Sequence, residues 1–80
     1  MKATVLIRPK EGILDPQGDA VRKSLQKLGF DVHAARVGRV VDLDVMADDA
    51  GGARAEIQRM CEVLLANPLI ESFEIRLEES

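Results

Sequence analysis

Few residues of this 80-residue chain have side chains that could do chemistry, and each needs neighbours to do it. The single cysteine, Cys61, lies on an apolar helical stripe, and free cysteines are among the most buried residue types. The single histidine, His33, could face Asp44 across a hairpin, but the sequence places no nucleophile or oxyanion hole beside this pair. We therefore expect Cys61 to pack in the core and His33 with Asp44 to form a surface cross-strand pair.

Three further patterns resemble binding sites without completing one. Asp42 and Asp44 share a strand face, but a cation cage needs more oxygen ligands and a shaped loop. Gly51-Gly52 lacks the lysine and hydroxyl residue of a phosphate-binding loop. Arg36 and Arg39 flank a predicted turn without the interleaved aromatic residues of an RNA-binding sheet. We expect no catalytic residue, metal site or bound cofactor in this chain.

Length and charge narrow the classes of protein further. A chain of 80 residues supports one domain, over residues 1–80, and buries only about 60% of the surface that its unfolded form exposes, which favours association with other subunits. The net charge of -3 opposes binding to nucleic acid. The apolar run at the start of the sequence is too short for a signal peptide or a membrane span, so we expect a cytoplasmic protein with no membrane partner.

Hydrophobic periodicity predicts the elements that would position these residues. The first strand covers residues 3–7 and ends before Pro9. Strands over 32–37 and 40–45 are joined by Gly38-Arg39, which suits a two-residue hairpin turn with Val37 opposite Val40. An apolar stripe in the second half of the chain predicts a helix that stops at Asn67-Pro68, and a last strand follows over residues 73–77. The stripe comprises Ile57, Met60, Cys61, Leu64 and Leu65.

The segment "LDPQG" marks the start of the first helix. Asp15 can cap the helix and Pro16 suits its first position, so we predict a helix from Pro16 to Leu28 that ends at a left-handed Gly29. A helix start can also bind an anion, which would use Gln17 and Gly18. Capping is the simpler of the two interpretations, because every helix start has free N–H groups to satisfy.

The order βαββαβ favours an α+β, ferredoxin-like fold: a four-stranded antiparallel sheet with both helices on one face. The other face of this sheet stays open. We predict that four residues form a subunit interface there: Leu6, Ala35, Val37 and Val40. Five more are candidate contacts with a partner: Asp15, Gln17, Gly18, Arg36 and Arg39.

In order and spacing, the whole chain resembles the PurS family, the small subunit of phosphoribosylformylglycinamidine synthase in purine biosynthesis. The segments that carry this resemblance are "LDPQG" followed by "AVRKSLQKLGF", "ARVGRVVDLDV" across the predicted hairpin, and "MCEVLLANPLIESFEI" toward the end of the chain.

The resemblance implies a noncatalytic subunit of an ATP- and glutamine-dependent C–N ligase complex. In that complex a glutaminase subunit releases ammonia, and a large synthetase subunit, where ATP and magnesium are expected, converts formylglycinamide ribonucleotide to formylglycinamidine ribonucleotide. The small subunit would bridge the two and support ammonia transfer, as a homo-oligomer, either dimer or tetramer.

Two other readings stay open at the level of sequence. A small dimeric ferredoxin-like module could bind a metabolite and regulate another protein, with Asp15 to Gly18 as its contact. An independent enzyme that uses His33 is the weaker alternative, because no second catalytic group accompanies it.

Overall fold

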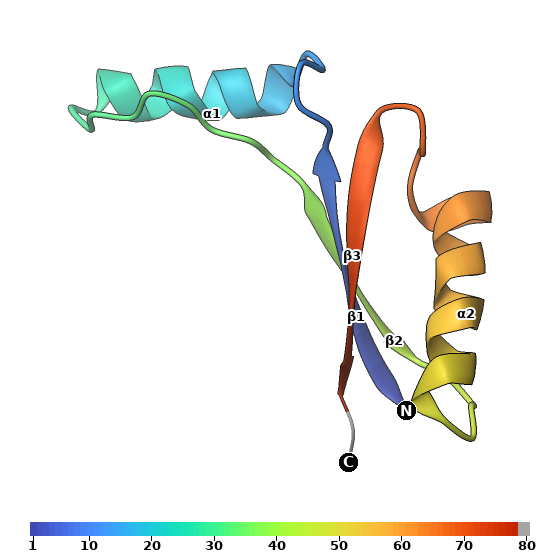
Figure 1. Ribbon diagram of the computed structural model, residues 1–80. Helices are drawn as coiled ribbons and strands as arrows, with labels where there is room; N and C mark the ends of the chain where they lie inside the picture. Colours follow the sequence, from blue (N-terminus) through green and yellow to red (C-terminus); the bar gives the residue numbers. More distant parts are fainter. Residues whose placement is uncertain (79–80) are drawn as a thin grey trace.

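The computed structural model describes residues 1–78 as a three-stranded antiparallel sheet with one helix packed against it and another held away from it (Figure 1). Along the chain the elements are β1 (Lys2–Pro9), α1 (Pro16–Lys27), β2 (Arg39–Asp44), α2 (Ala50–Met60), the π-helical turn η1 (Cys61–Leu65) and β3 (Glu71–Glu78). We call the sheet with α2 and η1 the body, and residues 16–38 the arm. No helix in this part of the chain is long and apolar enough to cross a membrane.

The first strand, β1, is the centre of the sheet, with β2 and β3 on either side. Alternation along β1 places Ala3, Val5 and Ile7 on one face, and all three are buried. Their neighbours on the adjacent strands are apolar in five of six cases: Leu43 and Leu77, Val41 and Ile75, and Arg39 and Phe73. This face of the sheet is therefore the floor of the hydrophobic core.

The helix α2 covers that face. Ala53, Ile57 and Cys61 follow one another at four-residue spacing and have no exposed surface. The helix begins where the carboxylate of Asp49 accepts a hydrogen bond from the backbone N–H of Gly52 at 2.6 Å. Cys61 is thus a core residue, as its position on the apolar stripe predicts.

The end of the second helix departs from the predicted stripe. Over Cys61–Leu65 the helix widens to a π turn, in which the backbone N–H of Ala66 donates to the carbonyl of Cys61, five residues earlier. This wider turn changes the angular spacing of the side chains. Leu64, predicted to face the core, is consequently 81% exposed.

The first helix forms as predicted. It begins at Pro16 with Asp15 as its cap and ends within one residue of the predicted Leu28. Gly29 has a φ of +95°, and the N–H of Phe30 donates to the carbonyl of Leu25, which is the expected Schellman ending.

The position of the first helix is different from the prediction, because α1 does not pack on the sheet (Figure 1). Residues 32–38 do not form the fourth strand: they run back along α1 in extended form, so the predicted hairpin and the His33–Asp44 pair are wrong for the single chain. The backbone at Gly38 passes so close to β1 that a Cβ there would lie 2.2 Å from the carbonyl oxygen of Ile7. The chain therefore continues straight into β2 where the hairpin turn was expected.

Candidate interaction surface

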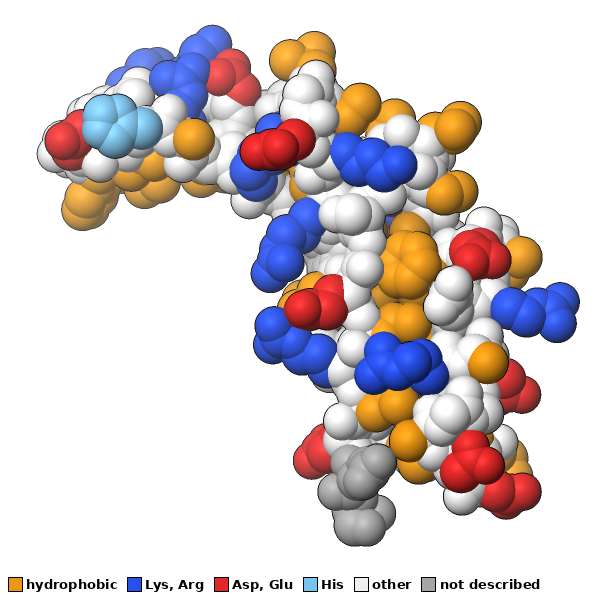
Figure 2. All heavy atoms as spheres, viewed as in Figure 1, with side chains coloured by type: hydrophobic (Ala, Val, Ile, Leu, Met, Phe, Trp, Pro, Cys, Tyr) orange, Lys and Arg blue, Asp and Glu red, His pale blue; other side chains and the backbone are white. Residues whose placement is uncertain are grey.

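The arm projects from one end of the body and leaves apolar side chains uncovered. Figure 2 shows hydrophobic side chains gathered along the lower edge of the arm in that view. Val21, Leu28 and Phe30 are 42%, 73% and 58% exposed. The only buried residue of α1 is Gly18. Exposed apolar side chains along a helix form a surface that another protein can cover.

The arm is nevertheless an ordered unit, because one carboxylate joins its two halves. The two oxygens of Asp15 accept hydrogen bonds from the backbone N–H of Gly18, at 3.0 Å, and of Val37, at 2.9 Å. The hydrogen bond from Gly18 and then that from Val37 lower the pKa of this carboxyl below its usual value. The two segments also touch directly, since a Cβ on Gly18 would lie 2.3 Å from the carbonyl oxygen of Ala35.

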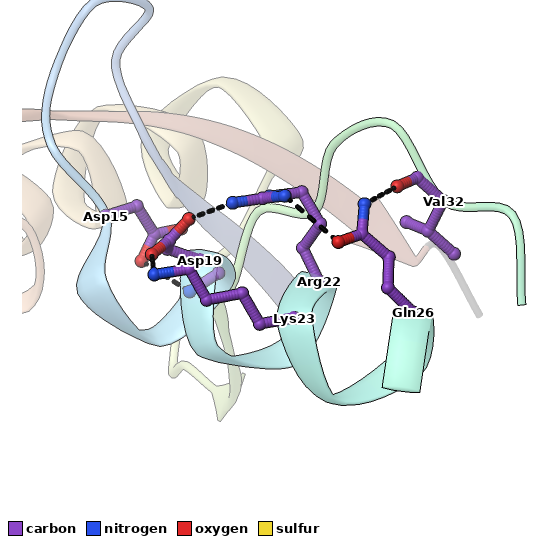
Figure 3. Close-up of polar contacts among 7 residues, drawn as sticks. Asp15, Asp19, Arg22, Lys23, Gln26 and Val32 are labelled. Atoms are coloured by element: carbon purple, nitrogen blue, oxygen red, sulfur yellow. Dashed lines mark hydrogen bonds and ion pairs between the residues drawn. The ribbon is translucent and has the colours of Figure 1, made fainter. Parts of the chain in front are cut away.

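Polar side chains along α1 continue this connection (Figure 3). Arg22 contacts the carboxylate of Asp19 at 2.5 Å and donates to the side-chain oxygen of Gln26 at 3.3 Å. The side-chain amide of Gln26 in turn donates to the carbonyl of Val32 at 2.9 Å. Lys23 contacts the other oxygen of Asp19 at 3.0 Å. The returning segment is thus attached to α1 near both ends of the helix.

Two arginines lie where the arm joins the body. Arg36 donates to the backbone carbonyls of Pro9, at 3.2 Å, and Lys10, at 2.5 Å. Arg39 makes two hydrogen bonds to Glu71, at 2.6 and 3.0 Å, and a third to the carbonyl of Leu65. These contacts join the base of the arm to β1, β3 and the end of η1.

The hydrogen bonds between Arg39 and Glu71 shift the pKa values of both side chains. The hydrogen bond from Arg39 lowers the pKa of Glu71, helped by the backbone N–H of Asn67, while Glu71 raises the pKa of Arg39. Glu71 is only 17% exposed and Arg39 is 50% exposed. Sequence reasoning missed this pair, because the residues are 32 positions apart and nothing local connects them.

The predicted interface residues separate into two places. Leu6 and Val40 are cross-strand neighbours on the open face of the sheet, where Val40 is 59% exposed. Ala35 and Val37 are half-buried on the returning segment beside the start of α1. Of the candidate partner contacts, Asp15 and Gly18 have structural roles within the arm, and Gln17 is exposed.

A second group of exposed apolar residues lies at the end of the body from which the arm leaves. Leu14, Leu69 and Ile70 are 85%, 83% and 42% exposed. The loops that carry them are joined by a hydrogen bond from the N–H of Lys10 to the carbonyl of Ile70, at 2.9 Å. The sequence analysis did not single out these residues, although apolar residues next to Pro68 in a loop are a recognisable signal.

The residues considered for chemistry are not assembled into a reaction centre. Cys61 is buried, and burial raises the pKa of its thiol, which makes it a poor nucleophile. His33 is exposed on the arm, whereas Asp44 lies on β2 beside the N-terminal amino group at 3.4 Å. Among residues 1–78, no three His, Cys, Asp or Glu side chains are grouped closely enough to hold a metal ion.

Comparison with known proteins finds the same fold and sequence pattern. The family model for PurS, described as phosphoribosylformylglycinamidine (FGAM) synthase, matches residues 2–79. The chain is 43% identical to the PurS subunit of that synthase from Archaeoglobus fulgidus, over 94% of this chain and 95% of the relative. The crystal structure of PurS from Methanocaldococcus jannaschii superposes with a TM-score of 0.87 at 36% identity, over 99% of this chain and 96% of that chain. A chain in the structure of PurLQS from Thermotoga maritima matches with a TM-score of 0.86 at 29% identity, over 94% and 93%.

Proposed function

Since this chain belongs to the PurS family, we propose that it is the noncatalytic small subunit of a phosphoribosylformylglycinamidine synthase and bridges the glutaminase and synthetase subunits of that complex. Its relative from Thermotoga maritima is part of a structure described as PurLQS. The observation that carries the proposal is the arm: an ordered unit whose apolar side chains Leu28 and Phe30 lack a covering surface in the single chain.

In this proposal the bond-making steps belong to the partners. The glutaminase releases ammonia from glutamine, and the synthetase, which holds ATP and magnesium, uses it to convert formylglycinamide ribonucleotide. This chain holds the two subunits together and helps to exclude water from the route between them. Water matters because protonation converts ammonia to ammonium, which has no lone pair with which to attack.

The bridging role is tested by leaving the chain out of a reconstituted complex. Synthesis is measured once with glutamine and once with added ammonia as the nitrogen donor. We expect the glutamine-dependent rate to fall more, because it alone requires transfer between subunits. If leaving out the chain changed neither rate, the bridging role would be rejected.

Self-association through the arm is the second part of the proposal. The strand β2 has β1 on one side, and its other edge is unpaired within residues 1–78. An unpaired edge accepts another strand, and the extended segment 32–37 of a second copy has the length and the β-branched residues to supply it.

An exchange of arms between two copies would give each body what it lacks. The partner's segment 32–37 would become a fourth strand, and the partner's α1 would cover the half-buried Val41 and Leu43 at the β2 side of the core. Each half would then have the four strands and two helices that the sequence predicts, from two chains. Exchange of identical elements is a common route to symmetric dimers.

Light scattering on the purified chain tests this part. We expect a mass of two copies or a multiple of two, in agreement with the predicted dimer or tetramer. A monomeric mass across the concentration range, with no mixing of differently labelled chains, would reject the exchange of arms and leave the bridging role standing.

A further inference from the structure

Three basic side chains surround the base of the arm: Arg8, Lys10 and Arg36. Within residues 1–78, five ion pairs are present, and none of them involves these three residues. The chain as a whole has a net charge of -3, so three cations without an ion pair in one place are a local exception. A local excess of positive charge attracts negatively charged groups over several ångströms.

Main-chain carbonyls hold two of these side chains in place without neutralising them. The guanidinium of Arg36 donates to the carbonyls of Pro9 and Lys10, and the amino group of Lys10 donates to the carbonyl of Pro68 at 2.7 Å. A carbonyl oxygen satisfies a hydrogen-bond donor but carries no net charge. The carboxylate of Asp15 accepts its hydrogen bonds from the backbone N–H groups of Gly18 and Val37, and after these bonds the positive charge of Arg36 also helps to lower its pKa.

Two acidic residues of the adjacent strand, Glu74 and Glu71, are already paired with arginines. Glu74, which is next to Leu6 across the sheet, binds Arg76 at 2.9 Å. Glu71 binds Arg39, which also lines the hollow described below, at 2.6 Å. Arg8 and Arg36 are thus left without an ion pair among residues 1–78, and Arg8 is the more available to a group from outside the chain because Arg36 also lies in the field of Asp15.

An apolar surface lies between these two guanidinium groups. Leu6 and Val40 form the floor of a shallow hollow of about 260 Å³, with Arg8 and Arg36 among its lining residues. The hollow is open to solvent, so it suits side chains of another protein better than an enclosed small molecule. An arginine beside an aliphatic patch recognises a carboxylate that is followed by an apolar residue.

We propose that this hollow receives an acidic segment of one of the partner subunits, with a carboxylate between Arg8 and Arg36 and an aliphatic side chain on Leu6 and Val40. This proposal rests on the bridging function and names one of its contact sites. A second copy of the chain is a poorer occupant. The same region of a second copy carries the same positive charges, so the two would repel each other.

Charge reversal at Arg8 tests the proposal directly. The variant Arg8→Glu is compared with Arg59→Glu, which makes the same change in net charge at an exposed position of α2 that does not line the hollow. Binding of each variant to the purified glutaminase and to the purified synthetase is measured by interferometry at low and at physiological salt. Light scattering on both variants confirms that self-association is unchanged.

We expect Arg8→Glu to weaken binding to one of the two subunits by about tenfold or more and to reduce its salt dependence. Arg59→Glu should bind like the original chain. Equal binding by the two variants would overturn this site while leaving the bridging role intact, whereas failure of the original chain to bind either subunit would reject the bridging role itself. A selective loss of binding to a single-stranded oligonucleotide, with both subunits still bound normally, would also overturn the proposal.

Discussion

The two helices start in the same way and end in different surroundings. Each is capped by an aspartate whose carboxylate accepts a hydrogen bond from a glycine N–H three residues later: Asp15 from Gly18 and Asp49 from Gly52. Yet α2 packs its apolar stripe into the core, while α1 leaves its stripe exposed. The comparison teaches that local signals decide whether a helix forms, and that the surface which covers it is decided by the rest of the fold.

The largest expected effect comes from shortening a core side chain. Ile57 on α2 has no exposed surface, so Ile57→Ala should lower the free energy of unfolding by about 3 kcal/mol. The matched change in the arm, Leu28→Ala, removes an aliphatic side chain that is 73% exposed and should have a much smaller effect on the body. Urea denaturation at one fixed protein concentration measures both. Equal losses would show that the arm and the body do not differ as described.

A charge on the arm should affect association more than folding. Phe30→Asp places a carboxylate among the exposed apolar side chains of the arm, since Phe30 is 58% exposed. We expect the dimer dissociation constant to rise tenfold or more, since a desolvated charge would lie at the interface. Sedimentation velocity gives the mass, and far-ultraviolet circular dichroism checks the helix content. An unchanged mass would remove Phe30 from the interface.

The contact between α1 and the returning segment should be sensitive to a single methyl group. Gly18→Ala would place a Cβ 2.3 Å from the carbonyl oxygen of Ala35, so the segments must separate. We expect a loss of about 1–3 kcal/mol in stability and weaker self-association. The control Gly51→Ala adds the same methyl group in α2, where the nearest atom is an oxygen of Asp49 at 3.5 Å. It should be neutral or slightly stabilising.

The smallest effect is expected from acid. The pKa values of Asp15 and Glu71 are lowered in the folded chain, so their contribution is present above the pKa values of the unfolded chain, about 4. This stabilising contribution is lost as the pH falls through the pKa values of the folded chain, which are lower. Urea midpoints at pH 7, 4 and 3 should decrease in this order. Asp15→Asn should reduce the decrease relative to Asp48→Asn, a change at an exposed residue between β2 and α2. Identical acid responses would remove Asp15 from the set of stabilising carboxylates.

Much of the local structure could be predicted because its causes are local. The cap at Asp15, the left-handed Gly29 and the burial of Cys61 each follow from a residue and its neighbours within a few positions. The alternation of β1 and β3 identifies their core faces for the same reason. Resemblance of the ordered segments then indicated the family, which the match over residues 2–79 confirms.

The rest depended on contacts between distant residues. Gly38-Arg39 has the composition of a hairpin turn, but here Gly38 passes close to Ile7 on β1, and β2 begins at the next residue. The π turn that exposes Leu64 has no sequence signature of its own. The Arg39–Glu71 pair and the basic side chains at the base of the arm meet only when three strands and two loops are in place.

The bidentate role of Asp15 has a consequence for the rate of assembly. With one of its oxygens on the helix start and the other on the returning segment, this side chain holds the two halves of the arm together as one rigid unit. A flexible segment loses conformational entropy when it binds another subunit. A rigid arm has already lost that entropy when its own chain folds. Association of subunits through the arm should therefore occur in a single kinetic step, with little rearrangement of either subunit.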